Sequence, residues 1–226
     1  MQCCIRKNMA IFISENNTMK GFFITFEGGE GAGKTTQIDK TKSYLESKGR
    51  KVITIREPGS TPIAEDIRNL LKSVRNDDRM CDTAELLLMY AARAQLVNTL
   101  IKPKLEEGFD ILCDRHDLST IAYQGGGRMM NMDDINAIRN VVLKSFRPDL
   151  TVLIDVPPKV GMARARNRGE LDRFEISNAD FFERVDKAYH DYAEKHPDTV
   201  AVVDGTLSVQ EVSEQIIKNI QERLDV

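Results

Sequence analysis

The feature that most constrains this chain of 226 residues is a glycine-rich turn between an apolar segment and an amphipathic one. Residues 22–27 read FFITFE, and Gly28, Gly33, Lys34 and Thr35 then fill the fixed positions of the pattern G-x-x-x-x-G-K-[ST]. Glycine lets the backbone adopt positive φ and approach a polyphosphate, and the next helix directs its free N–H groups at that anion. The pattern therefore predicts a strand, a phosphate-binding loop (P-loop) and a helix that together bind a nucleoside triphosphate.

The polar residues of this loop have expected tasks. Lys34 is expected to reach the β- and γ-phosphates of ATP, and the Thr35 hydroxyl is expected to be a ligand of Mg²⁺. A glycine-rich turn without chemical meaning is the alternative, but the helical spacing of Ile38, Thr41 and Leu45 after the loop argues against it. The residues predicted to bind ATP here are Gly28, Gly29, Glu30, Gly31, Ala32, Gly33, Lys34, Thr35 and Thr36.

Composition favours one α/β domain. The chain is 41% hydrophobic, enough for a sizeable core, and its net charge of −3 argues against non-specific binding of DNA or RNA. Its four cysteines lack metal-ligand spacing, and Cys113 lies in an apolar segment, which predicts a core position. Free thiols and the lack of a secretion signal indicate the cytoplasm, and no apolar run is long enough for a membrane helix. Neither nucleic acid nor a membrane is therefore an expected partner.

The beginning of the chain differs from the rest. It contains Met1, Met9 and Met19, and the first predicted strand starts at Phe22. We expect residues 1–18 to be an extension that is disordered or not native, and residues 19–226 to form a single domain.

Apolar segments alternate with amphipathic ones along this domain, which predicts a mostly parallel sheet covered by helices on both faces. The predicted strands are residues 22–27, 51–55, 110–114, 150–155 and 199–203. The predicted helices are residues 34–48, 61–73, 82–106, 133–145, 158–167 and 178–195, and a last one with Val209, Ile216 and Leu224 at helical spacing. Pro103 is expected to kink or end the long helix 82–106.

A second group of polar residues follows the predicted strand 110–114. Asp114 ends this strand, where a Walker-B-like acid holds Mg²⁺ directly or through water. Arg115 comes next, at the carboxyl edge where open α/β sheets bind ligands, although a structural salt bridge would also explain such a pair. Three glycines, residues 125–127, lie between Gln124 and Arg128 and predict a loop that wraps a small anionic ligand.

Four motifs, in order, resemble those of the bacterial-type thymidylate kinase family. They are EGGEGAGKTT at 27–36, REPGSTP at 56–62, DRHDLSTIAYQGGGR at 114–128 and RARNRGELDRFE at 164–175. The resemblance extends from Met19 to the end of the chain. It implies a three-layer α/β P-loop nucleotide kinase with a five-stranded parallel sheet. The implied reaction transfers the γ-phosphoryl group of ATP to dTMP with Mg²⁺, in a cytoplasmic homodimer.

The resemblance also assigns an acceptor site. It implies that Glu30 faces the 3′-hydroxyl and the acceptor phosphate, that Arg115 clamps this phosphate, and that Arg93 hydrogen-bonds the thymine carbonyl. Tyr123 lies where a 2′-hydroxyl would clash, and Met89 replaces a phenylalanine that the family stacks on thymine. Without the resemblance, Arg93 reads as a helix-surface cation and Tyr123 as a core aromatic residue. The residues implied to bind dTMP are Glu30, Glu57, Pro58, Met89, Arg93, Arg115, Ser119, Thr120, Tyr123 and Gln124.

A lid at about residues 164–176 completes the implied site. Some relatives carry an arginine in the P-loop where this chain has Gly31, so a mobile arginine of the lid, Arg168, is expected to neutralise the moving phosphoryl group instead. Arg164 is expected to contact ATP. The catalytic residues implied are Glu30, Lys34, Arg115 and Arg168.

The sequence leaves three other functions to compare with this one. A GTPase would need D-x-x-G and N-K-x-D or T-K-x-D motifs, and the chain contains neither. A P-loop ATPase module acting on nucleic acid or protein would be expected to carry a basic stripe. A kinase for another nucleoside monophosphate shares the P-loop and differs only in the residues that recognise the base.

Overall fold

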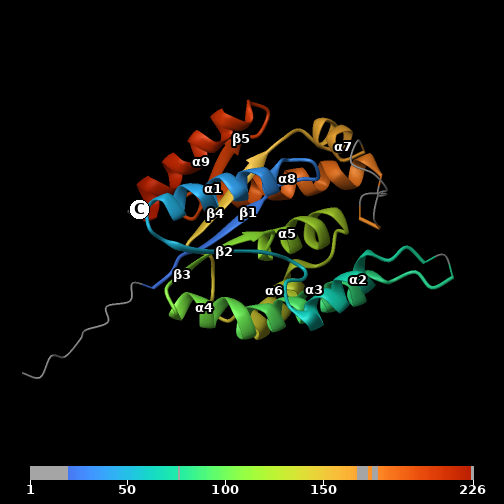
Figure 1. The fold of residues 1–226 in the computed structure, drawn as a ribbon. Helices are drawn as coiled ribbons and strands as arrows, with labels where there is room; N and C mark the ends of the chain where they lie inside the picture. Colours follow the sequence, from blue (N-terminus) through green and yellow to red (C-terminus); the bar gives the residue numbers. More distant parts are fainter. Residues whose placement is uncertain (1–19, 76, 167–172, 175–177, 225–226) are drawn as a thin grey trace, which may run out of the picture.

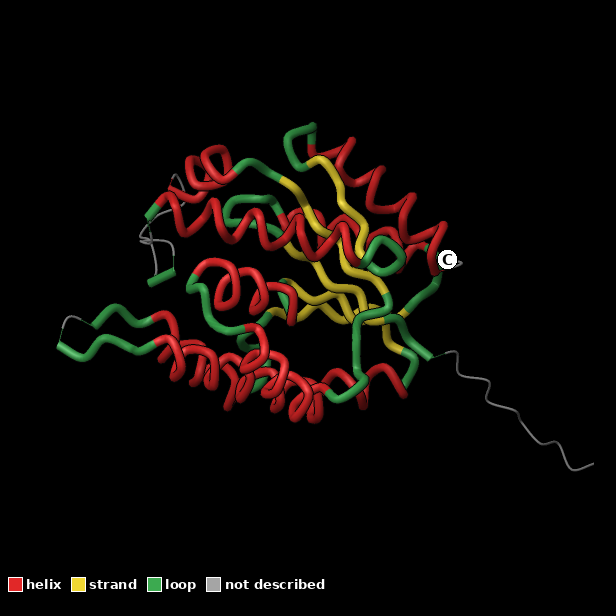
Figure 2. Tube along the Cα trace, turned by 180° about the vertical axis from the view of Figure 1, so that it is seen from behind, coloured by secondary structure: helices red, strands yellow, loops and turns green. Residues whose placement is uncertain are grey.

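In a computed structural model, which describes residues 20–224 apart from 76, 167–172 and 175–177, a five-stranded sheet lies between two layers of helices (Figures 1 and 2). The predicted extension 1–18 lies outside the described residues. The strands are β1 (Phe23–Glu27), β2 (Lys51–Arg56), β3 (Phe109–Asp114), β4 (Leu150–Asp155) and β5 (Val200–Asp204). Each predicted strand agrees with its observed counterpart to within one residue at either end.

The predicted helices occur in the predicted order, and the short helix at residues 117–120 and the π-helical turn at residues 121–127 were not predicted. The described helices are α1 (Lys34–Ser47), α2 (Pro62–Lys72), α3 (Asp82–Leu96), α4 (Lys102–Glu106), α5 (Asp117–Thr120), α6 (Met132–Leu143), α7 (Pro158–Arg166), α8 (Ala179–Lys195) and α9 (Val209–Leu224), with π-helical turns η1 (Val97–Ile101) and η2 (Ile121–Gly127). Side-chain caps fix several starts: Thr61 accepts from the Ala64 N–H before α2, and Asn178 accepts from the Phe181 N–H before α8. None of these helices is long and apolar enough to cross a membrane.

All strand pairs of the sheet are parallel, in the order β2-β3-β1-β4-β5. Strand β1 pairs with β3, with Phe26 opposite Asp114, and on its other side with β4, with Glu27 opposite Leu153. The chain leaves β1 toward β2 and leaves β3 toward β4, so the connections diverge above the carboxyl ends of these two neighbours. Such a point is where open α/β sheets bind ligands.

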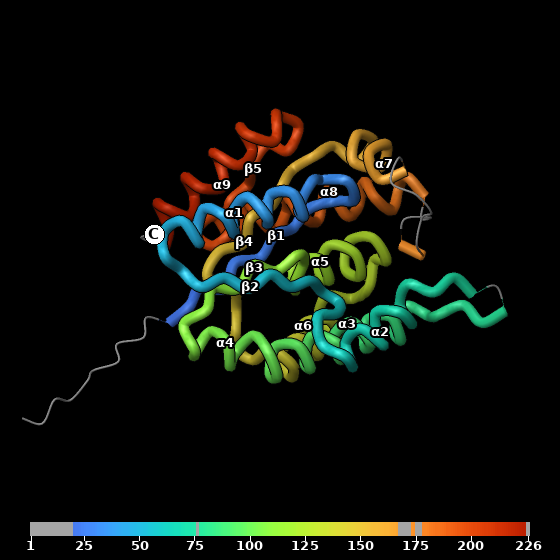
Figure 3. Tube along the Cα trace, in the orientation of Figure 1, coloured from blue at the N-terminus to red at the C-terminus, as the bar shows by residue number. Residues whose placement is uncertain are grey.

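Alternate side chains of the strands face different helices. Ile24 and Phe26 of β1 pack with residues of α1 and α9, which lie side by side on one face of the sheet (Figures 1 and 3). Phe23 of the same strand faces the opposite layer, where it packs with residues of α3, η1 and α4. Cys113 is completely buried in this second cluster, as predicted. The two-residue period of the strands thus anchors both helical layers.

The predictions for the proline and the glycines of two helical segments have different outcomes. The long segment 82–106 stays helical to Glu106, so Pro103 does not end it, but the regular α-helix is interrupted beside Pro103 by the π-helical turn η1. The glycines of residues 125–127 lie in η2 and not in a ligand-wrapping loop. Their small size serves packing: a Cβ on Gly126 would lie 2.6 Å from the Ala188 Cβ of α8, and a Cβ on Gly127 would lie 2.4 Å from the Phe181 ring.

Candidate active site

The P-loop turns sharply between β1 and α1 with help from its glycines. Gly28, Gly31 and Gly33 all have positive φ, of 138°, 69° and 91°. A Cβ on Gly28 would approach the Ile154 carbonyl oxygen to 2.5 Å, so the close approach of the loop to β4 also requires glycine. The loop then feeds directly into α1, whose first residue is Lys34.

Gly31 occupies a position where a side chain does not fit. A Cβ there would lie 2.1 Å from the carbonyl oxygen of Gly161 in α7, and the φ of 69° is strained for any other residue. An arginine at this place in the loop would therefore require the loop and α7 to separate. The lack of a cationic side chain here follows from the packing of these two backbones.

Lys34 is almost fully buried beneath the loop that precedes it. Its ammonium group donates to the carbonyl oxygens of Gly28 and Gly29, at 3.1 and 3.0 Å. Burial, together with the nearby charge of Arg115, lowers the pKa of Lys34 to about 8. The ammonium group is thus held at the loop by backbone oxygens, in a place where polyphosphate oxygens would be stronger partners.

Asp114 ends β3 beside the P-loop. Its Oδ1 atom is buried and has no hydrogen-bond partner among the described residues. A buried carboxylate oxygen without a partner is costly, and a hard cation with oxygen ligands would satisfy it. Thr35 lines the same cavity and offers a hydroxyl oxygen. These two residues fit Mg²⁺ by the chemistry of their donor atoms.

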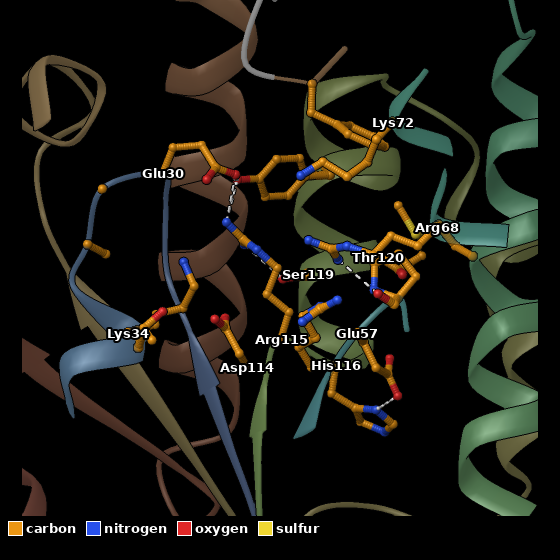
Figure 4. Close-up of a pocket in the computed structure, with 18 of the residues that line it drawn as sticks. Glu30, Lys34, Glu57, Arg68, Lys72, Asp114, Arg115, His116, Ser119 and Thr120 are labelled. Carbon is orange, nitrogen blue, oxygen red and sulfur yellow. Dashed lines mark hydrogen bonds and ion pairs between the residues drawn. The ribbon is translucent and has the colours of Figure 1, made fainter. Parts of the chain in front are cut away.

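Arg115 lies at the centre of the site with its backbone in the left-handed region, at φ 68° (Figure 4). Its Nη1 donates to the Gly28 carbonyl oxygen, to Ser119 Oγ and to Tyr189 Oη, at 3.0 to 3.2 Å. Its Nη2 donates to Glu30 Oε1 at 2.7 Å and to Tyr123 Oη at 3.2 Å. A strained backbone of this kind costs about 1 kcal/mol or more, and these bonds hold the guanidinium in place.

Glu27, at the end of β1, organises the segment around Arg115. Its carboxylate accepts from the His116 N–H at 2.7 Å and from Ser119 Oγ at 2.5 Å. Burial raises the pKa of Glu27, although Ser119 and Arg115 oppose this shift. Tyr189 of α8 joins the group, with its hydroxyl 2.9 Å from Ser119 Oγ and 3.3 Å from Glu27 Oε2.

Arg93 of α3 is buried in a second polar network at the other end of the site. Its Nε donates to Glu57 Oε2 at 2.7 Å, and His116 Nδ1 lies 2.8 Å from the other oxygen of that carboxylate. Its Nη2 donates to the His116 carbonyl oxygen and to Thr120 Oγ1, and its Nη1 contacts Asp117 Oδ1 at 3.4 Å. Burial opposes ionisation of Glu57, but the charges of His116 and Arg93 outweigh it and lower the pKa to about 2.

A cavity of about 780 Å³ joins the P-loop to this second network (Figure 4). The predicted site residues that it brings together are Glu30, Gly31, Ala32, Gly33, Lys34, Thr35, Thr36, Glu57, Pro58, Met89, Arg93, Asp114, Arg115, Ser119, Thr120, Tyr123, Gln124 and Arg164. Gly28 and Gly29 do not line it and contribute through Lys34. Arg168 lies outside the described residues.

Several residues around the cavity were missed by the sequence analysis. Arg56, Arg68, Lys72, His116 and Phe174 also line it. Arg68 and Lys72 are four residues apart on α2, and Arg68 donates to the Pro58 carbonyl oxygen at 2.8 Å. The sequence signal that could have indicated these two residues is a pair of cations at helical spacing just after the REPGSTP motif. Tyr189 had no comparable signal, because it lies within an ordinary amphipathic helix.

Comparisons with known proteins agree with this geometry. The sequence profile of the family described as "Thymidylate kinase" matches residues 26–216. A thymidylate kinase of Idiomarina loihiensis is 46% identical over 91% of this chain and 100% of its own length. One of Legionella pneumophila is 42% identical over 92% and 98% of the two chains. The crystal structure of the Ehrlichia chaffeensis thymidylate kinase superposes with a TM-score of 0.74 at 31% identity, covering 89% of this chain and 100% of that one. The chain therefore belongs to the thymidylate kinase family.

Proposed function

We propose that this protein transfers the γ-phosphoryl group of ATP to dTMP, giving ADP and dTDP, as a step toward dTTP. The observation that carries the proposal is the single cavity, because the P-loop at one end and the Arg93 network at the other open into the same space. Phosphoryl transfer demands positioning and neutralisation of charge and little covalent chemistry. A cavity lined by cations between two recognition ends meets that demand.

The donor nucleotide would bind at the P-loop. The loop amides and the start of α1 would bind the β- and γ-phosphates, and Lys34 would exchange its two carbonyl partners for phosphate oxygens. Thr35 and Asp114 would hold Mg²⁺, directly or through water, which supports the proposed use of that ion. When bound, Mg²⁺ supplies positive charge to the phosphate oxygens. Arg164, which lines the cavity and donates to the Gly205 carbonyl oxygen at 3.2 Å, would lie beside ATP.

The acceptor phosphate would bind at Arg115. The Nη2 edge of this guanidinium now pairs with Glu30, so a phosphate dianion would compete with that carboxylate for the same N–H groups. Released from this pair, Glu30 would be able to accept from the 3′-hydroxyl of the deoxyribose. Tyr123, whose hydroxyl donates to Glu30 Oε1 at 2.9 Å, would close the sugar side and exclude a 2′-hydroxyl.

The base would bind at Arg93. A guanidinium has five N–H groups, and four of those of Arg93 have partners among the described residues, which would leave one on Nη1 for the thymine carbonyl. Met89 lines the cavity and would cover the ring face. Glu57, Pro58, Thr120 and Gln124 complete this end of the pocket.

The experiment that tests the function is an ADP-release assay with ATP and Mg²⁺ against dTMP, dUMP, dCMP, dGMP and AMP. We expect fast turnover with dTMP and slower turnover with dUMP. Turnover of another monophosphate without dTMP would contradict the roles of Arg93 and Met89. ATP hydrolysis that depends on no acceptor would contradict a kinase altogether.

We propose further that the protein acts as a cytoplasmic homodimer. The two cysteines that the structure describes, Cys81 and Cys113, are free thiols, which supports a reducing compartment. Five of the eleven exposed large hydrophobic residues that the structure describes lie on neighbouring helices α2, α3 and α6. They are Ile63, Leu70, Leu87, Met132 and Val141. Exposed apolar residues on helices that pack together would suit an isologous contact with a second copy.

A further inference from the structure

One face of α3 directs three residues toward the base end of the cavity. Glu85, Met89 and Arg93 are spaced four residues apart, so they share that face of the helix. Met89 and Arg93 line the cavity itself. Glu85 does not line it and is completely buried, yet it contacts Gln124, which does line the cavity.

The Glu85 carboxylate accepts hydrogen bonds from three side chains. Its Oε1 accepts from Gln124 Nε2 at 2.6 Å, and its Oε2 accepts from Arg173 Nη1 at 2.5 Å and from Arg128 Nη2 at 3.2 Å. Burial by itself would raise the pKa of Glu85, but the Gln124 hydrogen bond and the charges of Arg128 and Arg173 outweigh burial and lower it. Glu85 is therefore ionised at neutral pH and offers acceptors alone.

An ionised carboxylate determines which way the Gln124 amide points. The amide has a donor end, NH₂, and an acceptor end, the carbonyl oxygen, whereas a carboxylate can only accept. Turning the amide around would place two acceptors 2.6 Å apart in a buried place, which is strongly unfavourable. The NH₂ end of Gln124 is therefore held by Glu85, and the end left for a ligand is the carbonyl oxygen.

We propose that Glu85 is a positioning residue that determines base specificity, because it commits Gln124 to presenting an acceptor to the pyrimidine ring. Thymine and uracil carry a hydrogen on N3 and match this acceptor. Cytosine carries a lone pair on N3 and is repelled by it. Arg93 would distinguish a carbonyl group on C4 from an amino group. Glu85, acting through Gln124, would distinguish an N3 that carries a hydrogen from one that carries a lone pair. This inference rests on the proposed function, since it presumes a pyrimidine monophosphate as acceptor.

The test compares kcat/KM for dTMP, dUMP and dCMP in Glu85→Gln. A glutamine at position 85 can donate or accept, so Gln124 becomes free to turn. We expect the preference for dTMP over dCMP to fall about tenfold or more. Gln124 can then turn its NH₂ group toward cytosine N3, which removes the repulsion between that nitrogen and the Gln124 carbonyl oxygen. The ratio of dTMP to dUMP should stay unchanged, since both bases carry the N3 hydrogen. A merely loosened pocket would alter this second ratio as well.

Arg128→Gln is the matched control. It removes one ion pair from the same carboxylate, while Gln124 keeps its hydrogen bond. We expect this variant to retain the wild-type ratio of dTMP to dCMP even if its stability falls. In a Gln124→Ala background, Glu85→Gln should no longer change the ratio. An unchanged ratio in Glu85→Gln, or an equal loss in Arg128→Gln, would overturn the proposal.

A second measurement needs no substitution at the buried carboxylate. In ¹⁵N NMR spectra of the unaltered protein, the Gln124 side-chain NH₂ resonance, assigned by its loss in Gln124→Ala, should be protected from solvent exchange with and without dTMP. Exchange at the rate of a free amide would overturn the inference even if Glu85→Gln does not fold. If the unaltered protein does not turn over dTMP, the proposed function is contradicted instead. The NMR measurement does not depend on turnover, so the two failures can be told apart.

Discussion

At the scale of single residues, Arg115 has two ends with different surroundings. Its Nη1 end is held by a backbone oxygen and by two uncharged hydroxyls, of Ser119 and Tyr189. Its Nη2 end is paired with Glu30, an anion that a phosphate can displace. If Arg115 holds the acceptor phosphate as proposed, the Nη1 contacts would orient the guanidinium before the acceptor binds, so little side-chain entropy would be lost on binding.

Tyr189→Phe tests this orientation, because it removes one hydroxyl and leaves the buried ring. We expect KM for dTMP to rise about tenfold, since a hydrogen bond to a charged group is lost, while KM for ATP stays the same. Thymidine, which lacks the phosphate, should bind both proteins equally in calorimetry. Tyr44→Phe is the control, because the Tyr44 hydroxyl contacts Gln221 on the surface. Equal losses for dTMP and thymidine would contradict a role through Arg115.

The lowered pKa of Lys34 predicts how ATP binding varies with pH. Below about pH 8 the side chain is a cation that attracts phosphate, and above it the free protein holds a neutral amine. Affinity for ATP should therefore weaken as pH rises from 8 to 9.5, because binding then requires uptake of a proton. Calorimetric titrations across this range measure the trend. Lys34→Arg stays protonated, so its affinity for ATP should not change with pH over this range. If the affinity of the unaltered protein is equally constant, the lowered pKa of Lys34 is contradicted.

At the scale of elements, the contact between the P-loop and α7 connects the loop to the proposed lid. Because Gly31 has no room for a side chain, position 31 cannot supply an arginine to the moving phosphoryl group, and we expect the lid to supply one instead. We expect Arg168→Ala to lower kcat by about 10³ or more, the effect of losing an arginine finger, with little change in KM for dTMP. Arg166→Ala, at the end of α7, is the matched control. Steady-state kinetics measure kcat and KM for both variants. A fall in kcat of less than tenfold for Arg168→Ala would refute the proposal that Arg168 neutralises the moving phosphoryl group.

The packing of η2 against α8 makes a different prediction. A Cβ on Gly126 would also lie 2.9 Å from the Arg184 backbone oxygen, which cannot move aside, whereas a Cβ on Gly125 would meet the flexible sulfur of Met132. Gly126→Ala should reduce the free energy of unfolding by about 1–3 kcal/mol through overpacking. Gly125→Ala gains the same helix propensity and should cost less. Urea unfolding of both variants measures the difference, and equal stabilities would contradict the packing account.

The same segment shows what the sequence could and could not predict. The P-loop, Asp114 and Arg115 were predictable because strand ends and glycine patterns fix where such residues lie. Residues 125–127 were expected in a loop, because glycine normally disfavours helices, and only the close approach of α8 shows why Gly126 and Gly127 have to be small. Arg68 lines the cavity from α2, whereas Glu85 of α3 and Tyr189 of α8 contact residues that line it. Which helices meet at the site depends on tertiary packing, and no local sequence pattern predicts it.

At the scale of the whole molecule, the exposed apolar residues of α2, α3 and α6 lead us to predict a measurable assembly. We expect sedimentation velocity to give about twice the chain mass of 25.6 kDa. Leu87→Glu should shift it to the monomer, because an isologous contact brings two such charges together or buries them. Leu207→Glu, which follows β5 away from these helices, is the control. A monomeric unaltered protein would contradict the proposed dimer.

The shared cavity has a consequence for inhibitor design. Among the described residues, the P-loop and the Arg93 network open into one continuous cavity, so one molecule that joins adenosine and thymidine through a chain of phosphates would be able to occupy both ends at once. Once one nucleoside of the conjugate is bound, the other would bind intramolecularly, at an effective concentration set by the phosphate linker. The affinity of the conjugate relative to that of either nucleoside alone would therefore depend on the number of phosphates. A series of such conjugates would act as a molecular ruler, and the tightest member would report the span between the two nucleosides.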